Sequence, residues 1–261
     1  MTQRKKRTFT LSPDIWICLL ILAGLFFFSL SRDKSAPPPT AAALETVQAF
    51  AEKNHLTLSD YPESLLSLLS RNPETEQFVL QYPLKKDGIP TIDLSDMKDC
   101  QQVPLLLQWD QRWGYTTYGS DLMGITGCGP TTLSMVAIYL TGDTSLDPLT
   151  VADFARKNGY CVPGSGSAWT LISEGGPLLG LTVEEIPLDE GILTRTLANG
   201  TPVVAVMGPG DFTDDGHFLV LTGVKDGKIT LNDPNSPRRS ETLWDYETLK
   251  GQILVLWACS K

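Results

Sequence analysis

The chain has 261 residues, of which 42% are hydrophobic and 20% are charged, so it has enough apolar material to bury a core. Six basic and two acidic residues lie in positions 1–35, and the remaining residues carry 15 basic and 28 acidic side chains, a net charge of −13. Such an anionic surface repels phosphate backbones, which argues against nucleic acid as a partner.

The N-terminus has the pattern of a membrane-targeting segment. Residues 1–14 are basic, and residues 15–31 that follow are apolar and carry no charged side chain. Basic residues keep their flank in the cytoplasm, so residues 15–31 are predicted to anchor the protein in the cell membrane with the rest on the extracytoplasmic side. Ser29-Leu30-Ser31 also fits a cleavage site, and secretion after signal cleavage is the alternative. Residues 32–43, rich in Pro and Ala, are predicted to form a tether.

Residues 44–99 are predicted to form a helical prelude. Apolar periodicity and capping residues predict helices over residues 44–54, 61–70 and 73–80. Because a segment of this length cannot bury a sufficient core by itself, these helices are expected to pack on the domain that follows. His55 lies in a polar stretch of the prelude and is expected at the surface.

Cys128 lies where a Gly-Cys-Gly-Pro turn opens an apolar run at helical spacing. Unpaired N–H groups and the positive end of the helix dipole stabilise a thiolate at such a position. A buried structural cysteine is the alternative. The flanking glycines favour the nucleophile, because they let a substrate backbone approach the sulfur closely.

His217 is the predicted base for this nucleophile. It begins a β-branched and aromatic run that turns at residues 225–228 and returns, which predicts an antiparallel hairpin. The hairpin brings the end of its second strand back to His217, where Asn232 and Asp233 are both candidates to orient the imidazole.

Strand alternation favours Asp233. Residues Ile229, Leu231 and Asp233 share one face of the second strand, and Asn232 lies on the other. The apolar face is expected to pack on the Cys128 helix. Asp233 is therefore predicted to hold the imidazole tautomer, with Asn232 as the second choice.

A side-chain amide is the fourth expected part of the site. Gln108 precedes Cys128 by twenty residues. Together with the backbone N–H of Cys128, its amide would form an oxyanion hole for a tetrahedral intermediate. Gln111 is a competitor that nothing local excludes.

These motifs together resemble cysteine peptidase family thirty-nine of the papain clan, which includes double-glycine leader peptidases of bacteriocin exporters and secreted stand-alone relatives. The matching motifs are Val103-Pro104 to Gln108, Gly127 to Thr131, Gly216-His217-Phe218 and Asn232-Asp233-Pro234. The resemblance assigns a peptidase domain to residues 100–261. It implies an α+β, papain-like, two-lobed fold, with Cys128 on the helical lobe and His217 and Asp233 on an antiparallel sheet. It also implies Cys128 as nucleophile, His217 as base, Asp233 as orienting residue and Gln108 in the oxyanion hole.

No cofactor is expected. The sequence has no Walker motif, so neither a nucleotide nor bacteriocin maturation by a transporter is predicted, and no Cys/His spacing indicates a metal. Cys100 and Cys259 bracket the domain and are the candidate pair for a disulfide in an exported protein. Cys161 lies in a loop expected to border the cleft.

The rest of the domain is predicted to place helices before antiparallel strands, the segregated α+β pattern. The predicted helices are 149–158, 169–179 and 189–199, and the predicted strands are 203–207, 217–224, 228–233 and 252–258. Asp211, Asp214 and Asp215 precede His217. They are expected to favour basic substrates or to raise the pKa of His217, and a solvated loop is the simpler account.

The sequence therefore predicts a membrane-anchored, extracytoplasmic cysteine peptidase that acts on a peptide or protein substrate through an acyl-enzyme. One alternative is a papain-like hydrolase of cell-wall peptides or isopeptide bonds. The other is a catalytically silent peptide-binding module on the same fold.

Overall fold

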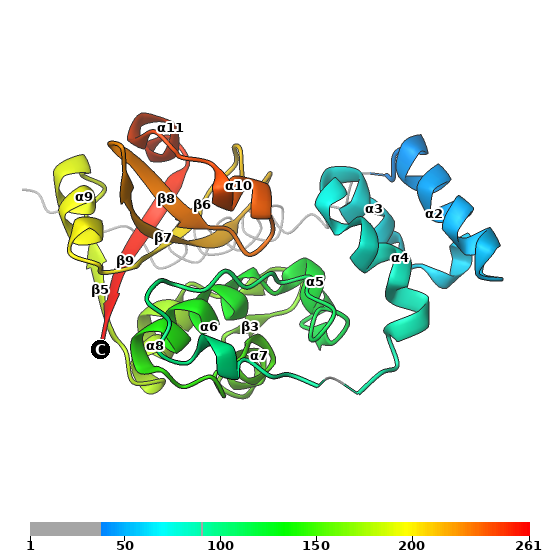
Figure 1. The fold of residues 1–261 in the computed structure, drawn as a ribbon, viewed down its shortest axis with the longest axis horizontal. Helices are drawn as coiled ribbons and strands as arrows, with labels where there is room; N and C mark the ends of the chain where they lie inside the picture. Colours follow the sequence, from blue (N-terminus) through cyan, green and yellow to red (C-terminus); the bar gives the residue numbers. More distant parts are fainter. Residues whose placement is uncertain (1–37, 90) are drawn as a thin grey trace, which may run out of the picture. The chain divides into compact units, whose positions relative to one another are not determined.

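A five-stranded antiparallel sheet forms one layer of the fold (Figure 1). The computed structural model describes residues 38–89 and 91–261. The strands of this sheet follow the order β5-β9-β6-β7-β8, and each neighbouring pair runs antiparallel. They are β5 (Thr182–Ile186), β6 (Val203–Met207), β7 (His217–Lys225), β8 (Lys228–Asn232) and β9 (Ile253–Ser260).

Apolar side chains cover both faces of this sheet. On β7, Phe218 and Val220 join the core that contains α6 (Cys128–Thr141), whereas Leu219 and Leu221 join a second core. Successive side chains of a strand point to opposite faces, so one strand serves both cores. Two helices close the second core, α9 (Glu190–Ala198) and α11 (Tyr246–Lys250).

The central helix of the first core is α6. Pro130 lies in its first turn, where a missing N–H costs nothing, and Gly142 ends it with a left-handed φ of 72°. Every residue from Gly129 to Ile138 is buried, because α7 (Pro148–Lys157) packs on one side and β7 on another. A helix enclosed on all sides is rigid, so its first residue, Cys128, is held in a defined place.

Three helices form the prelude, α2 (Ala41–Lys53), α3 (Glu63–Arg71) and α4 (Glu76–Lys85). They share a core with residues of the following domain. The rings of Phe78 and Tyr115 stack with centroids 4.6 Å apart, and the Tyr115 hydroxyl donates to the Phe78 carbonyl at 2.9 Å. Residues 38–261 accordingly form one compact unit.

The remaining elements of the described residues are short. They are η1 (Leu58–Asp60), η2 (Pro73–Thr75), η3 (Ser95–Met97), β1 (Thr117–Tyr118), β2 (Asp121–Leu122), α5 (Met123–Thr126), β3 (Cys161–Val162), β4 (Gly166–Ser167), η4 (Leu171–Gly175), α8 (Gly176–Leu178) and α10 (Pro237–Glu241). The predicted helix at 169–179 is a π-helical turn, η4, followed by α8. Two adjacent glycines and Pro177 disfavour a regular α-helix there.

Strand β5 is absent from the predicted elements. It pairs only with β9 at the edge of the sheet, and three of its five residues are exposed. An edge strand with so much exposed surface lacks the apolar alternation that identifies a half-buried strand in a sequence.

The apolar face of β8 packs away from α6. Ile229 and Leu231 lie in the second core with Leu249 of α11. The prediction that this face packs on the Cys128 helix is therefore wrong. Its error has a physical cause: both faces of the sheet are covered, so an apolar strand face does not reveal which layer it meets.

Cys100 and Cys259 both carry free thiols, which corrects the predicted disulfide. Cys259 lies inside the first core, where its sulfur is 3.7 Å from the Trp257 carbonyl oxygen. Burial raises the pKa of this thiol to about 12. Cys100 and Cys259 thus lie at the two ends of the domain in sequence without forming a disulfide in the structure.

The predicted basic N-terminus (1–14), the anchor (15–31) and most of the tether (32–43) lie outside the described residues. Across residues 38–89 and 91–261, no helix combines the length with the apolar run that crossing a bilayer requires.

Candidate active site

Cys128 is the first residue of α6, directly after the short helix α5. The glycines on either side of it fit closely packed positions. A Cβ on Gly127 would lie 2.4 Å from the Met123 carbonyl oxygen, and a Cβ on Gly129 would lie 2.5 Å from Ser167 Oγ. The turn around the sulfur therefore tolerates only glycine at these two positions.

His217 is the first residue of β7, opposite Met207 of β6. Its side chain is buried, and its Nε2 lies 2.7 Å from Asp233 Oδ1. The imidazole also acts on the Cys128 thiol, because it lowers the pKa of that thiol. Because Asp233 engages Nε2, Nδ1 is the nitrogen left for the sulfur. The other histidine, His55, is exposed.

Asp233 directly follows β8 and is fully buried. Its carboxylate accepts hydrogen bonds from three groups: His217 Nε2 at 2.7 Å, the Asn235 N–H at 2.7 Å and Arg239 Nε at 2.5 Å. Asn232, the other candidate, points away and donates from Nδ2 to the Val103 carbonyl at 2.8 Å. The hairpin thus brings Asp233, and not Asn232, to the imidazole.

The electrostatics of these residues favour an ion pair. Burial raises the pKa of the Cys128 thiol, but the interaction with His217 outweighs burial and brings the pKa below its usual value. Burial lowers the pKa of His217, but the Asp233 carboxylate outweighs it and raises the pKa to about 10. The pKa of Asp233 is lowered in spite of burial, by His217 and then by Arg239. A thiolate beside an imidazolium is the reactive form of such a pair.

Gln108 lies between the turn before Cys128 and the turn after Asp233. Its backbone N–H donates to the Pro234 carbonyl at 2.7 Å, and its Nε2 donates to the carbonyls of Gly124 at 3.0 Å and Ile125 at 3.1 Å. Its Oε1 is buried and has no hydrogen-bond partner among the described residues.

Gln111, the competing amide, is held elsewhere. Its Oε1 accepts from Lys85 Nζ, and its Nε2 lies 3.4 Å from the Gln77 carbonyl. Both partners belong to α4, so Gln111 is part of the contact with the prelude.

Three side chains beside the site were not identified from the sequence: the half-buried Arg239 and the buried Tyr118 and Ser167. Arg239 binds the far side of the Asp233 carboxylate, and Tyr118 and Ser167 hold each other with their hydroxyl oxygens 2.7 Å apart. Burial raises the pKa of Tyr118, with smaller contributions from the nearby thiols of Cys161 and Cys128. No motif marks these residues, because they reach the site from separate turns of the chain. Cys161 is half-buried beside Tyr118.

The acidic loop before β7 exposes its three carboxylates to solvent, in agreement with the simpler of the two expected accounts. The pKa of His217 is raised mainly by Asp233 and then by Cys128. Asp211 accepts a hydrogen bond from Gln252 Nε2 at 2.7 Å, and Asp214 and Asp215 are exposed.

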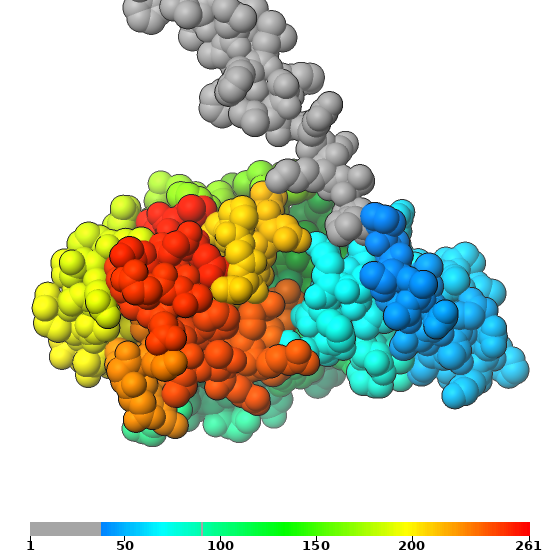
Figure 2. Space-filling model, turned by 90° about the horizontal axis from the view of Figure 1, so that it is seen from above, coloured from blue at the N-terminus to red at the C-terminus, as the bar shows by residue number. Residues whose placement is uncertain are grey.

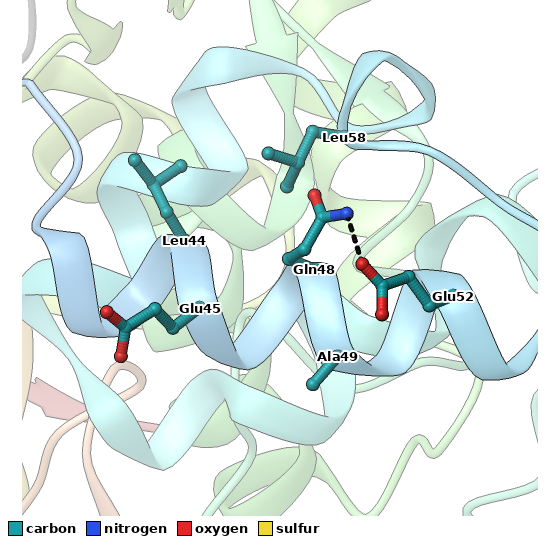
Figure 3. Close-up of a pocket in the computed structure, with 6 residues that line it drawn as sticks. All are labelled: Leu44, Glu45, Gln48, Ala49, Glu52 and Leu58. Carbon is teal, nitrogen blue, oxygen red and sulfur yellow. Dashed lines mark hydrogen bonds between the residues drawn. The ribbon is translucent and has the colours of Figure 1, made fainter.

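A surface groove lies apart from these residues, on α2 (Figure 3). Its lining contains three apolar side chains and two carboxylates, with Gln48 donating to Glu52 at 2.7 Å. It has no nucleophile and no histidine, so it offers none of the chemistry that Cys128 and His217 offer. Within the described residues, no cluster of three or more His, Cys, Asp or Glu side chains is arranged to hold a metal ion.

The fold is that of a papain-like α+β protein, with the cysteine at the start of a core helix and the histidine on an antiparallel sheet. The model of the Peptidase_C39 like family matches residues 100–259, and the chain belongs to this family.

Two solved structures are similar to the chain. The peptidase domain of Streptococcus ComA, described as a bi-functional ABC transporter involved in a quorum-sensing pathway, is 19% identical, with a TM-score of 0.41 over 60% of this chain and 96% of that one. A C39-like peptidase from Bacillus anthracis is 16% identical, with a TM-score of 0.37 over 64% of this chain and 96% of that one. No curated protein matches the chain.

Proposed function

We propose that the protein is a cysteine peptidase in which Cys128 is the nucleophile, His217 the acid and base, and Asp233 the orienting carboxylate. The observation that carries the proposal is the contact of His217 Nε2 with buried Asp233 at 2.7 Å, on an imidazole that also lowers the pKa of the Cys128 thiol. Membership of the Peptidase_C39 like family supports peptide bonds as the target.

The reaction follows from this arrangement. The Cys128 thiolate attacks the carbonyl carbon of a peptide bond, and the C–O π electrons move to the oxygen. Collapse of the intermediate breaks the C–N bond, and the His217 imidazolium gives its proton to the leaving amine. The neutral imidazole then takes a proton from water, whose oxygen attacks the thioester and releases Cys128 as a thiolate.

Gln108 is proposed to donate to the oxyanion together with the backbone N–H of Cys128. Its position between the two turns of the site supports this role. In the free protein its Nε2 faces two backbone carbonyls, so one of these hydrogen bonds has to be exchanged for the oxyanion when substrate binds. Catalytic hydrogen bonds often form only in the substrate complex.

We propose a cell-membrane location, with residues 15–31 as a single-pass anchor and the peptidase domain on the extracytoplasmic side. The basic flank and the uncharged run support this orientation. Added protease should then digest the domain in intact cells, and the N-terminus of the mature protein should begin before residue 15. A mature N-terminus after residue 31 would support the secreted form instead.

Alkylation of the full chain by iodoacetamide tests the activated thiol. Because the pKa of Cys128 is lowered by His217, Cys128 should react at least about tenfold faster than Cys161 near pH 7. His217→Ala should remove this advantage and move the alkylation profile of Cys128 to higher pH. Equal rates for the two thiols would exclude the proposed mechanism.

Substrate assays separate the proposed peptidase from its alternatives. Release of fragments from unmodified peptides, lost in Cys128→Ala, supports the peptidase. Activity confined to a muropeptide digest would favour the cell-wall hydrolase. A bound peptide that is never cleaved, with no reversible capture of a peptide aldehyde by Cys128, would favour the silent module.

A further inference from the structure

The loop that follows Asp233 is held from outside the peptidase domain. The Asn235 carbonyl accepts from Asn72 Nδ2 at 2.6 Å and from Trp109 Nε1 at 3.1 Å. Asn72 lies in the prelude, between α3 and α4, and is buried. The N–H of the same Asn235 donates to Asp233 Oδ1. One residue is therefore fixed on one side by the prelude and on the other by the carboxylate that faces His217.

A second contact runs through Glu74. Its carboxylate accepts hydrogen bonds from the Ser236 hydroxyl and from the Arg238 N–H, the latter at 2.9 Å. Ser236 is buried, and its Oγ accepts from the Arg239 N–H at 3.1 Å, which caps α10. Glu74 therefore holds Ser236, the N-cap residue of α10.

Helix α10 carries the cation of the site. Arg239 donates from Nε to Asp233 Oδ2 at 2.5 Å, on the carboxylate oxygen that His217 does not use. Its guanidinium also lies over the ring of Phe212, 5.8 Å from the centroid. A shift of α10 would carry Arg239 away and leave the buried carboxylate without its arginine partner.

We infer that the prelude is a positioning element of the active site, and that Asn72 and Glu74 are its positioning residues. They clamp residues 234–239 so that Asp233 stays aligned on the imidazole. Figure 2 shows the prelude surface, in cyan, meeting the orange surface that follows β8. The matched family region begins at residue 100, so these two residues lie outside it. The inference rests on the proposed function.

Two variants separate this role from simple packing. Asn72→Asp keeps an oxygen that can accept from the Glu74 N–H, as Asn72 Oδ1 does at 3.1 Å, but removes the donor to Asn235. Glu74→Gln keeps the size of the side chain and removes its charge. Glu76→Gln is the matched control, because Glu76 is exposed in the first turn of α4.

The measurements are kcat/KM and the pH profile of Cys128 alkylation in the full chain. A misaligned Asp233 stabilises the imidazolium less, so the thiolate forms at higher pH. Asn72→Asp and Glu74→Gln should each lower kcat/KM about tenfold and shift the alkylation profile upward, because a small misplacement of a catalytic group slows the reaction. Glu76→Gln should match the unmodified chain in both.

The outcomes are distinct. If Cys128 of the unmodified chain is hyperreactive and both variants keep its profile, the prelude does not position Asp233 and the inference is overturned, even where the variants lower Tm. If Cys128 of the unmodified chain reacts no faster than Cys161, the proposed function fails and the inference fails with it.

Discussion

At the scale of single residues, the carboxylate of Asp233 is the most constrained group of the site. It is fully buried and accepts from a histidine, a backbone N–H and an arginine. Burial alone would raise its pKa, and the charges of His217 and Arg239 reverse that effect. A buried carboxylate that keeps its charge can hold one tautomer of the imidazole and stabilise the imidazolium.

Asp233→Ala should lower kcat about a hundredfold or more, since the imidazole loses the partner of Nε2. Asn232→Ala is the matched comparison and should cost far less, because Asn232 bonds the Val103 carbonyl on the other side. Steady-state kinetics of both variants on a cleaved peptide measures the difference. A larger loss for Asn232→Ala would show that the residue facing His217 has been misassigned.

At the scale of elements, α6 holds Cys128 through the contact of its first turn with β4. Gly129 faces Ser167 there, and Ser167 in turn holds the buried hydroxyl of Tyr118. The turn has no room for a methyl group, although alanine is the better helix former. The shape of the site beside the thiol thus depends on a glycine in a helix.

Gly129→Ala should lower the free energy of unfolding by about 1–3 kcal/mol, the usual cost of overpacking. Its Cβ would lie 2.5 Å from Ser167 Oγ, and so short a side chain has little room to move. Gly251→Ala is the control, because no atom lies within 4 Å of a Cβ there. Denaturant unfolding measures both, and equal stability of the two variants would contradict the steric argument.

The elements that could be predicted are those with strong local patterns. Strand β6 has the predicted bounds, and the helix that begins at Cys128 and the hairpin of β7 and β8 follow the sequence pattern closely. The exposed edge strand β5 and the irregular turn η4 do not have such patterns. Local periodicity indicates that one face of an element is buried. Strand β5 is mostly exposed and η4 is a single irregular turn, so neither shows a clear periodicity.

At the scale of the whole molecule, one of the contacts that join the prelude to the peptidase domain is the aromatic ring of Phe78. Phe78 of α4 packs so closely on two glycines that a Cβ would lie 2.7 Å from the ring at Gly114 and 2.5 Å at Gly124. Gly124 also provides a carbonyl to Gln108. The ring therefore connects the prelude core to the turn that precedes Cys128.

Phe78→Ala should lower the free energy of unfolding by about 3–5 kcal/mol, as for a buried phenylalanine elsewhere. Leu84→Ala, at an exposed position of the same helix, should change it by no more than about 0.5 kcal/mol. Urea unfolding followed by two probes, one in each part, should show a single transition. Separate transitions would show that the prelude folds independently of the domain.

The sequence by itself determined the chemical types of the site and their local setting. Gly-Cys-Gly-Pro before an apolar helix, a histidine that opens a strand and a carboxylate that ends the partner strand are patterns that each span only a few residues. Helical and strand periodicity allow such patterns to be recognised in a sequence. Hairpin pairing then brings His217 and Asp233 together.

Only the tertiary structure decided which distant groups meet them. Glu74 and Ser236 are 162 positions apart, and Asn72 and Asn235 are 163 apart. Packing likewise places Gln108 at the turn before Cys128, Gln111 against α4 and Arg239 on Asp233. Periodicity shows that a side chain is buried but not which layer it packs against. Contacts between layers therefore cannot be assigned from periodicity alone.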